Sequence, residues 1–168
     1  MDFVWTPWRY RYIAAARQDD LCVFCEALKA GDDASVFILL RGSKNFVILN
    51  LYPYTAGHVM IVPYAHGGTL QACDTDTLSE MMLLAKRVQA ALEATYHPEG
   101  YNLGMNLGRA AGAGIEGHVH MHLLPRWSGD TNFMTTIAET RLEPEELAET
   151  FRKLRRALEP GSAAEKQR

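Results

Sequence analysis

The sequence predicts a single α+β domain, in which an antiparallel sheet of five or more strands is covered by one long helix and followed by a C-terminal helix. Short apolar runs bounded by glycine, proline and asparagine recur along the chain and are typical of strands. Residues 74–97 instead space their apolar side chains by three and four, which is the period of a helix. With 168 residues and 48% hydrophobic content, the chain can build one sizeable core.

Composition and charge argue against several classes of function. A formal net charge of −3 and a pI near 6.1 are not typical of proteins that wrap nucleic acid polymers. No apolar run reaches the roughly 18 residues of a membrane span, so no membrane association is expected. The first residues lack the features of a signal peptide, which makes the cytoplasm the expected location.

The first third of the chain is predicted to form an arm and three strands. Residues 1–20 are rich in aromatic and basic side chains, which must be covered by the domain itself or by a second subunit. Strands are predicted over residues 35–40, 45–50 and 58–63. Residues 41–44 between the first two strands have the composition of a hairpin turn.

The helix predicted over residues 74–97 has recognisable signals at both ends. Thr77 and Glu80 have the spacing of a capping box, and Pro98 supplies a stop after His97. Its apolar stripe consists of Leu78, Met81, Ala85, Val88 and Leu92. A helix of this length with one apolar face is the natural cover for the sheet.

A glycine-rich loop over residues 108–117 follows a fourth strand predicted over residues 101–107. Four glycines in ten residues let a backbone approach a ligand closely and turn its N–H groups inward, as phosphate-binding loops do. The loop lacks Gly-Lys-Ser/Thr and is therefore not a Walker A sequence. Glycine-rich connections are also common hairpin loops, so this loop alone is weak evidence for phosphate binding. The histidine-rich segment that follows strengthens that evidence.

Residues 117–125, Gly-His-Val-His-Met-His-Leu-Leu-Pro, carry the strongest functional signal. Apolar residues alternate with His118, His120 and His122, which is the period of a half-buried strand. All three imidazoles would then face the same way, about 6.6 Å apart along the strand. Half of the chain's six histidines on one strand face is hard to explain as packing. The residues leave open a three-histidine zinc site and a nucleophilic histidine with two helpers.

Cys22 and Cys25 form a Cys-x-x-Cys pair with the spacing of zinc ligands. Two thiolates do not complete a tetrahedral site, so a structural zinc would need distant ligands. The alternative is a reduced, metal-free pair. A catalytic redox pair is not favoured, because no thioredoxin-like βαβ pattern surrounds these residues.

The chain after the histidines is predicted to form a loop and a final helix. Trp127 either stacks on a nucleobase or packs under the polar loop that follows it. The helix is predicted to start at Glu143 and Pro144, with an apolar stripe and a solvated basic face in its last turns. Residues 161–168 are predicted to be disordered, which leaves 21–160 as the folded domain.

The triad segment resembles the signature of the histidine triad (HIT) superfamily of nucleotidyl hydrolases and transferases. The similarity can be followed from Cys22 to Trp127, some two thirds of the chain. Within the superfamily, the chain most resembles the HIT-type diadenosine tetraphosphate phosphorylases. The shared stretches are Trp5 to Arg9, Asn106 to Arg109, and Pro125 to Trp127.

This resemblance implies a fold, a homodimer, a zinc site and nucleotide contacts. The implied zinc ligands are Cys22, Cys25, His66 and His118. The implied nucleotide contacts are Asn50 at the ribose, His58 near the triad, Asn106 and Arg109 at the phosphates, Trp127, and the loop residues Gly112, Ala113 and Gly114. From the residues alone, Asn50 could equally be a turn residue, His58 a buried hydrogen-bonded histidine, and Arg109 a solvated side chain.

The resemblance also implies a mechanism, in which His120 attacks the α-phosphorus of a mono- or dinucleotide to form a nucleotidyl-histidine. His122 would help the leaving group to depart, and His118 would fix the local geometry. Many HIT hydrolases carry Gln at the position of Gly114 and Ser or Thr at that of Ile115. The smaller side chain would admit inorganic phosphate, which favours phosphorolysis. The alternatives are a HIT-type hydrolase and a nucleotide-binding protein with incidental catalysis.

Overall fold

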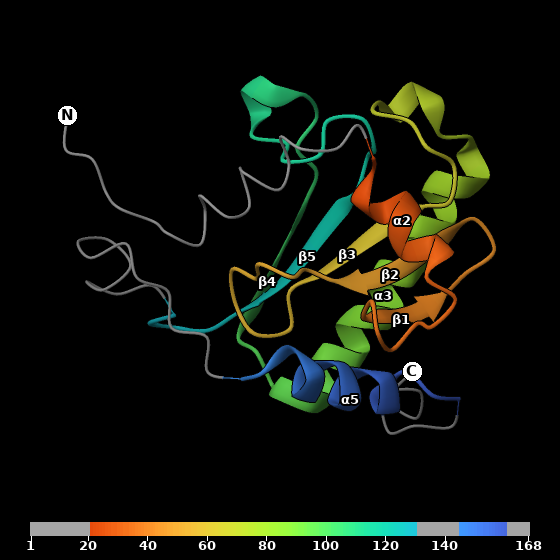
Figure 1. The fold of residues 1–168 in the computed structure, drawn as a ribbon. Helices are drawn as coiled ribbons and strands as arrows, with labels where there is room; N and C mark the ends of the chain where they lie inside the picture. The colour runs from red at the N-terminus through yellow and green to blue at the C-terminus, as the bar shows by residue number, and fades with distance from the viewer. Residues whose placement is uncertain (1–20, 131–144, 161–168) are drawn as a thin grey trace.

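The computed structural model describes residues 21–130 and 145–160, and within them it confirms the predicted α+β architecture. Five strands form one antiparallel sheet in the order β1-β2-β3-β5-β4 (Figure 1). The strands are β1 (Ile38–Arg41), β2 (Asn45–Leu49), β3 (Val59–Pro63), β4 (Gly100–Gly104) and β5 (Met121–Arg126). The helices are α2 (Val23–Lys29), α3 (Thr75–Tyr96) and α5 (Leu147–Ala157), with short 3-10 turns η1 (Leu70–Ala72) and η2 (Arg109–Ala111).

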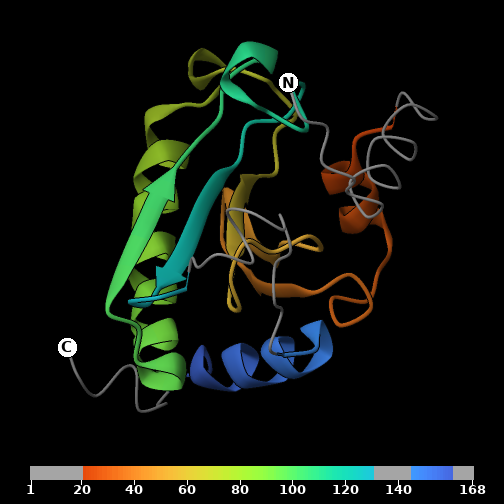
Figure 2. The same cartoon turned by 90° about the vertical axis from the view of Figure 1, so that its left-hand side faces the viewer.

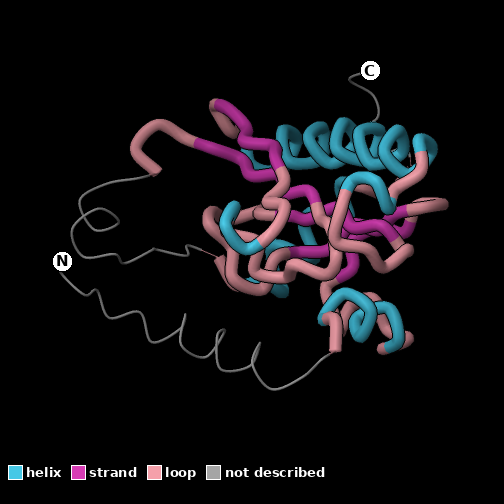
Figure 3. Tube along the Cα trace, turned by 90° about the horizontal axis from the view of Figure 1, so that it is seen from above, coloured by secondary structure: helices cyan, strands magenta, loops and turns pink. Residues whose placement is uncertain are grey.

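The central strands are buried on both faces of the sheet. On β2, Val47 and Leu49 belong to the core under α3 and α5, whereas Phe46 and Ile48 belong to a second cluster around Phe24 of α2. Figure 2 shows α3 and α2 on opposite sides of the sheet, and the view from above in Figure 3 agrees. Because both faces are covered, these strands are continuously apolar in sequence.

Helix α3 confirms the predicted long helix but corrects its N-terminal cap. The N-cap is Asp74, whose carboxylate accepts the backbone N–H of Thr77 at 2.7 Å. Thr77 therefore lies inside the first turn, and the predicted capping box does not form. The C-terminal end is as predicted, because His97 adopts a left-handed conformation with φ of 47° directly before Pro98.

Glu80 caps the β1–β2 hairpin instead of its own helix. Its carboxylate accepts the backbone N–H groups of Ser43, Lys44 and Asn45 at 2.6 to 2.8 Å, and Asn45 Nδ2 at 2.8 Å. Burial alone would raise the pKa of Glu80, but these hydrogen bonds lower it overall. One carboxylate from α3 therefore satisfies the orphan donors of the turn and ties the hairpin to the helix.

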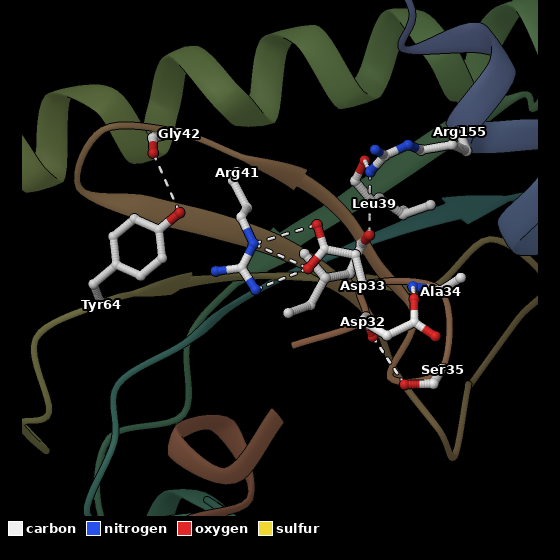
Figure 4. A network of polar contacts seen from close by, with 10 residues as sticks. Asp32, Asp33, Ala34, Ser35, Leu39, Arg41, Gly42, Tyr64 and Arg155 are labelled. Atoms are coloured by element: carbon white, nitrogen blue, oxygen red, sulfur yellow. Dashed lines mark hydrogen bonds and ion pairs between the residues drawn. The ribbon is translucent and has the colours of Figure 1, made fainter. Parts of the chain in front are cut away.

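Helix α5 packs against α3 and against β1 at the sheet edge. Its start falls at Leu147, and the predicted start at residues 143–144 lies outside the described residues. Arg155, predicted to be solvated, donates from Nη1 to the Leu39 carbonyl at 2.7 Å (Figure 4). On the same hairpin, Arg41 forms a bidentate ion pair with Asp33. These contacts fix the outer strand of the sheet.

Several predictions concern residues beyond the described ranges. The aromatic arm over residues 1–20, the run over 133–137 and the tail over 161–168 all lie outside them. Within the described residues, none of the helices is both long and apolar enough to cross a membrane.

Replacing Glu80 with Gln should destabilise the fold by about 2 to 3 kcal/mol, because an amide cannot accept all of these hydrogen bonds with a full negative charge. The stabilisation is present above the carboxylate's unfolded pKa and is lost as pH falls through the lowered folded pKa. Urea unfolding at pH 7 and at pH 4 measures both effects. The control is Glu93→Gln, the same change at an exposed α3 position that accepts one bond from Tyr101. Equal losses for the two variants would contradict this role.

Candidate nucleotidyl-transfer site

The triad segment forms a strand only in its second half, which corrects the predicted strand over residues 117–125. Strand β5 begins at Met121, while His118 and His120 precede it in irregular backbone and are buried. The neighbouring strand β3 ends at Pro63, which has no N–H to extend the ladder. Instead, the Val119 N–H donates to the carbonyl of Gly67 at 2.7 Å. The three histidine rings are therefore not oriented by one regular strand, and each is held by its own hydrogen-bond partners.

His118 turns its ring into the predicted cysteine cluster. Its Nδ1 lies 3.2 Å from Cys22 Sγ and 3.8 Å from Cys25 Sγ, and His66 Nδ1 lies 3.5 Å from Cys25 Sγ. The ligand atoms of all four residues fall within 4.8 Å of one another. The structure therefore brings together the four ligands that the resemblance implied.

The cluster fits a tetrahedral zinc ion. With Zn–S near 2.3 Å and Zn–N near 2.0 Å, a tetrahedral site places sulfur and nitrogen about 3.6 Å apart, close to the distances found. His118 Nε2 donates to the Pro63 carbonyl at 2.9 Å, which leaves the lone pair of Nδ1 facing the thiols. Two thiols and two imidazoles are a donor set that zinc prefers.

His120 has its ring orientation fixed by the backbone. Its Nδ1–H donates to the His118 carbonyl at 2.8 Å, so the neutral ring carries its lone pair on Nε2. Nε2 makes no hydrogen bond within the described part of the chain. The side chain is 4% exposed, and this burial lowers the pKa of His120. A neutral imidazole with a free nitrogen is the form of histidine that can act as a nucleophile.

His58 and His122 form a hydrogen-bonded pair in which each ring has a defined tautomer. The backbone N–H of Tyr54 donates to His58 Nδ1 at 3.1 Å, so the His58 proton must reside on Nε2. His58 Nε2–H then donates to His122 Nδ1 at 2.9 Å. Neutral His122 consequently carries its proton on Nε2, and its ring centroid lies 4.9 Å from that of His120. The Nε2–H of His122 is thus a hydrogen-bond donor beside the His120 ring.

Burial and mutual proximity keep these histidines uncharged near neutral pH. Burial, followed by the nearby His120, lowers the pKa of His122 to about 4. Burial likewise lowers the pKa of His118, with His66 and His120 adding smaller effects. The proximity of the three rings therefore disfavours any second positive charge in the cluster.

The other predicted nucleotide contacts divide into two groups. Asn50 donates from Nδ2 to His58 Nδ1 at 3.3 Å, and His58 is only 1% exposed, as expected of a buried hydrogen-bonded histidine. Asn106 Nδ2 donates to the carbonyl of Gly112 at 3.5 Å and so closes the first half of the glycine-rich loop, directly before Ala113 and Gly114. Both asparagines support elements that lead to the histidines.

The contacts of Arg109 and Trp127 fit a solvated side chain and a packed ring, respectively, rather than nucleotide contacts. Arg109 forms an ion pair with Glu116 at 2.7 Å, and its side chain is 90% exposed. The Trp127 ring meets Tyr96 of α3 edge to face at 6.5 Å. Trp127 follows the end of β5, about 16 Å along the chain from His122 at the rise of a strand. The structure therefore does not bring its ring to the histidines of its own chain.

Some residues around the histidines carry no signal that sequence patterns alone reveal. The Pro63 carbonyl and the Tyr54 N–H act through the backbone, whose partners depend on the fold. Phe24 contacts both His118 and His120 from α2. Its position inside the Cys-x-x-Cys pair was visible in the sequence, but its contact with the triad was not.

The histidine arrangement places a neutral imidazole with a free nitrogen beside a ring N–H on an α+β fold, and comparison with known proteins supplies the family of the chain. The HIT domain model matches residues 33–129, and the chain therefore belongs to the HIT family. It is 34% identical over 159 residues to AP-4-A phosphorylase of Mycobacterium tuberculosis, a match that covers 90% of this chain and 81% of that protein.

Two further relatives bear on the site. The chain is 33% identical over 109 residues to adenosine 5'-monophosphoramidase HNT1 of Candida albicans, covering 62% of this chain and 70% of that one. The crystal structure of a zinc-bound histidine triad family protein from Mycobacterium smegmatis matches with a TM-score of 0.67 and 29% identity, covering 85% and 94% of the two chains. The chain is thus a HIT-family enzyme whose cysteine–histidine cluster could hold a metal ion.

His122 should remain neutral down to about pH 4, whereas an unfolded histidine titrates near 6.5. Because the unfolded chain binds a proton that the folded one does not, this group removes stability as pH falls from about 6.5 towards 4. NMR titration of the His122 ring, assigned with His122→Ala, measures the midpoint. A midpoint at pH 6 or above would contradict the buried, neutral pair with His58.

Proposed function

We propose that this protein transfers a nucleotidyl group through His120 and that its reaction is the phosphorolysis of dinucleoside polyphosphates such as diadenosine tetraphosphate to ADP and ATP. The observation that carries the proposal is the tautomer pattern, with a lone pair on His120 Nε2 beside a proton on His122 Nε2. The similarity to a named AP-4-A phosphorylase over 90% of the chain supports the substrate class.

In the first step, His120 Nε2 attacks the α-phosphorus and forms a phosphorus–nitrogen bond as the bond to the bridging oxygen breaks. ATP leaves as an anion while the His122 Nε2–H donates a hydrogen bond to the departing oxygen, and His58 holds the His122 ring through its hydrogen bond to Nδ1. The hydrogen bond from His120 Nδ1 to the His118 carbonyl stabilises the positive charge that develops on the attacking ring.

In the second step, an oxygen of inorganic phosphate attacks the same phosphorus and the bond to His120 breaks. The product is ADP, and the proton of the incoming phosphate is released to solvent. If water attacked instead, the product would be AMP. The choice of nucleophile therefore distinguishes a phosphorylase from a hydrolase.

The loop before the triad supports phosphate as the nucleophile. Ile115, which replaces the hydroxyl residue of many HIT hydrolases, packs against the apolar cluster on the α2 side of the sheet. Gly114 has no side chain, so neither position contributes a polar side chain to the loop. The backbone N–H groups of Gly112 and Ala113 already donate within the loop, so those of residues 114–117 are the loop's donors for phosphate oxygens, without a side chain filling the space for a second nucleophile.

Hydrolysis of nucleoside phosphoramidates is the second candidate function. It is favoured by the 33% identity to a protein named adenosine 5'-monophosphoramidase. The same nucleophile serves both reactions, and the amine leaving group takes its proton from solvent. Water replaces phosphate in the second step.

We also propose that the cysteine–histidine cluster holds zinc as a structural ion. Bound there, it would join α2, through Cys22 and Cys25, to two other segments of the chain. These are the segment after β3, which carries His66, and the segment before β5, which carries His118. His118 would then serve two purposes, with its ring as a ligand and its carbonyl as the acceptor for His120. A homodimer and a cytoplasmic location remain predictions.

Incubation with diadenosine tetraphosphate should give ADP and ATP in the presence of inorganic phosphate and little product in its absence. Chromatography of the products measures this, and a ³²P-labelled phosphate should appear in the β-position of ADP. His120→Ala should lower turnover by about 10⁴-fold, because the covalent route is lost.

Two outcomes would overturn this assignment. AMP and ATP formed at equal rates with and without phosphate would identify a hydrolase. Turnover of adenosine 5'-phosphoramidate, but not of the dinucleotide, would identify the second candidate function. A parallel incubation with His120→Ala separates either activity from contaminating enzymes.

Metal analysis should find about one zinc ion per chain, and its removal by a chelator should lower the melting temperature by about 10 °C. Cys25→Ser should lose the metal and show the same shift. Cys73→Ser is the matched control, because this third free cysteine lies outside the cluster. Full zinc occupancy in Cys25→Ser would contradict the proposed ligand set.

A further inference from the structure

Helix α2 connects the cysteine–histidine cluster to His120, the proposed nucleophile, through the side chain of Phe24. Cys22 and Cys25 lie near His118, and between them Phe24 is buried, with 2% of its surface exposed. The Phe24 ring centroid lies 5.4 Å from that of His118 in an edge-on contact and 5.0 Å from that of His120. One aromatic ring therefore touches two of the three triad histidines.

The orientation of His120 depends on this contact. Its ring is held by a single hydrogen bond, from Nδ1 to the His118 carbonyl, and one hydrogen bond leaves the ring free to swing about that atom. Phe24 and His122 pack against the ring, the latter nearly perpendicular at 73°. In a close-packed environment, such neighbours select one rotamer. Phe24 therefore helps to determine where Nε2 points.

We propose that Phe24 is a positioning residue that couples the cysteine–histidine cluster to His120, because the cluster anchors α2 and α2 presses Phe24 onto the His120 ring. With the ligands held together, Nε2 is presented to the α-phosphorus. When they separate, α2 loosens and the ring loses its single orientation. The inference rests on the proposed function for the role of His120 as nucleophile.

Phe46 distinguishes positioning from ordinary hydrophobic packing. It belongs to the same apolar cluster as Phe24, and it is equally buried. Its ring, however, stacks on Tyr64 at 5.6 Å, and no ring contact joins it to a triad histidine within the described residues. Substituting either phenylalanine with leucine removes one aromatic ring from one cluster, but only Phe24→Leu removes the contact with His120.

The kinetic test compares Phe24→Leu with Phe46→Leu on the dinucleotide substrate. Phe24→Leu should lower kcat about tenfold with KM within twofold of wild type, because a misplaced nucleophile slows chemistry without weakening binding. Phe46→Leu should keep kcat within about twofold after a similar loss in melting temperature. Equal kcat losses would make Phe24 a packing residue. A raised KM with kcat retained would make it a substrate contact.

A second test needs no substrate and so remains valid if the proposed reaction is wrong. In ¹⁵N-histidine-labelled protein at pH 8, protonated and unprotonated ring nitrogens differ strongly in chemical shift. Wild-type His120, assigned with His120→Ala, should show a single tautomer protonated at Nδ1. Phe24→Leu should show a mixture of both tautomers, whereas Phe46→Leu should match the wild type.

Chelation tests the coupling itself in the same spectra. Stripping zinc from the wild type should produce the mixture seen in Phe24→Leu, and stripping it from Phe24→Leu should add little. His66→Ala should act like the chelator, because it removes a ligand that does not touch His120. Unchanged His120 signals after zinc removal would overturn the proposal, whatever the enzyme's substrate is.

Discussion

The hydrogen bond from His120 Nδ1 to the carbonyl of His118 is the interaction on which the site depends. It places the lone pair of His120 on Nε2, and without it the ring could carry its proton on that nitrogen, which the proposed reaction needs unprotonated. The carbonyl is itself fixed, because the His118 ring is held by Pro63 on one side and faces the cysteines on the other. The backbone carbonyl of a neighbouring triad histidine thereby sets the tautomer of His120, the proposed nucleophile.

The same reasoning extends through the paired histidines. A backbone N–H that can only donate fixes the proton position on buried His58, which in turn fixes it on half-buried His122. Both rings therefore carry defined protons without any charged residue. Carboxylates, the usual partners of catalytic histidines, would favour protonation and raise the pKa. Backbone groups instead leave the rings neutral, and burial lowers the pKa of His122 to about 4. Neutrality suits both a nucleophile and a donor whose next partner is an anion.

The four clustered ligands were implied by the family resemblance. Sequence patterns predicted the strands and the long helix, because their periodicity is a local property. They failed where a tertiary partner decides. The alternation at His118 and His120 indicated a strand, yet the β3–β5 ladder ends at the pair of Ile61 and Met121. The spacing of Thr77 and Glu80 indicated a helix cap, in which the Glu80 carboxylate would accept a single backbone N–H. The β1–β2 hairpin offers the same carboxylate three backbone N–H groups, and Glu80 binds these instead.

The two faces of the sheet divide stability and chemistry between them. The face under α3 and α5 holds the larger apolar core and has no triad ring in it. His122 pairs with Met60, whose side chain belongs to the α2 cluster, so the catalytic rings lie on the smaller face beside Phe24. A seven-residue helix buries too little to fix itself there. A metal cross-link at its two cysteines is therefore the element that can make this face rigid, which ties the order of the nucleophile to the ligands of the cluster.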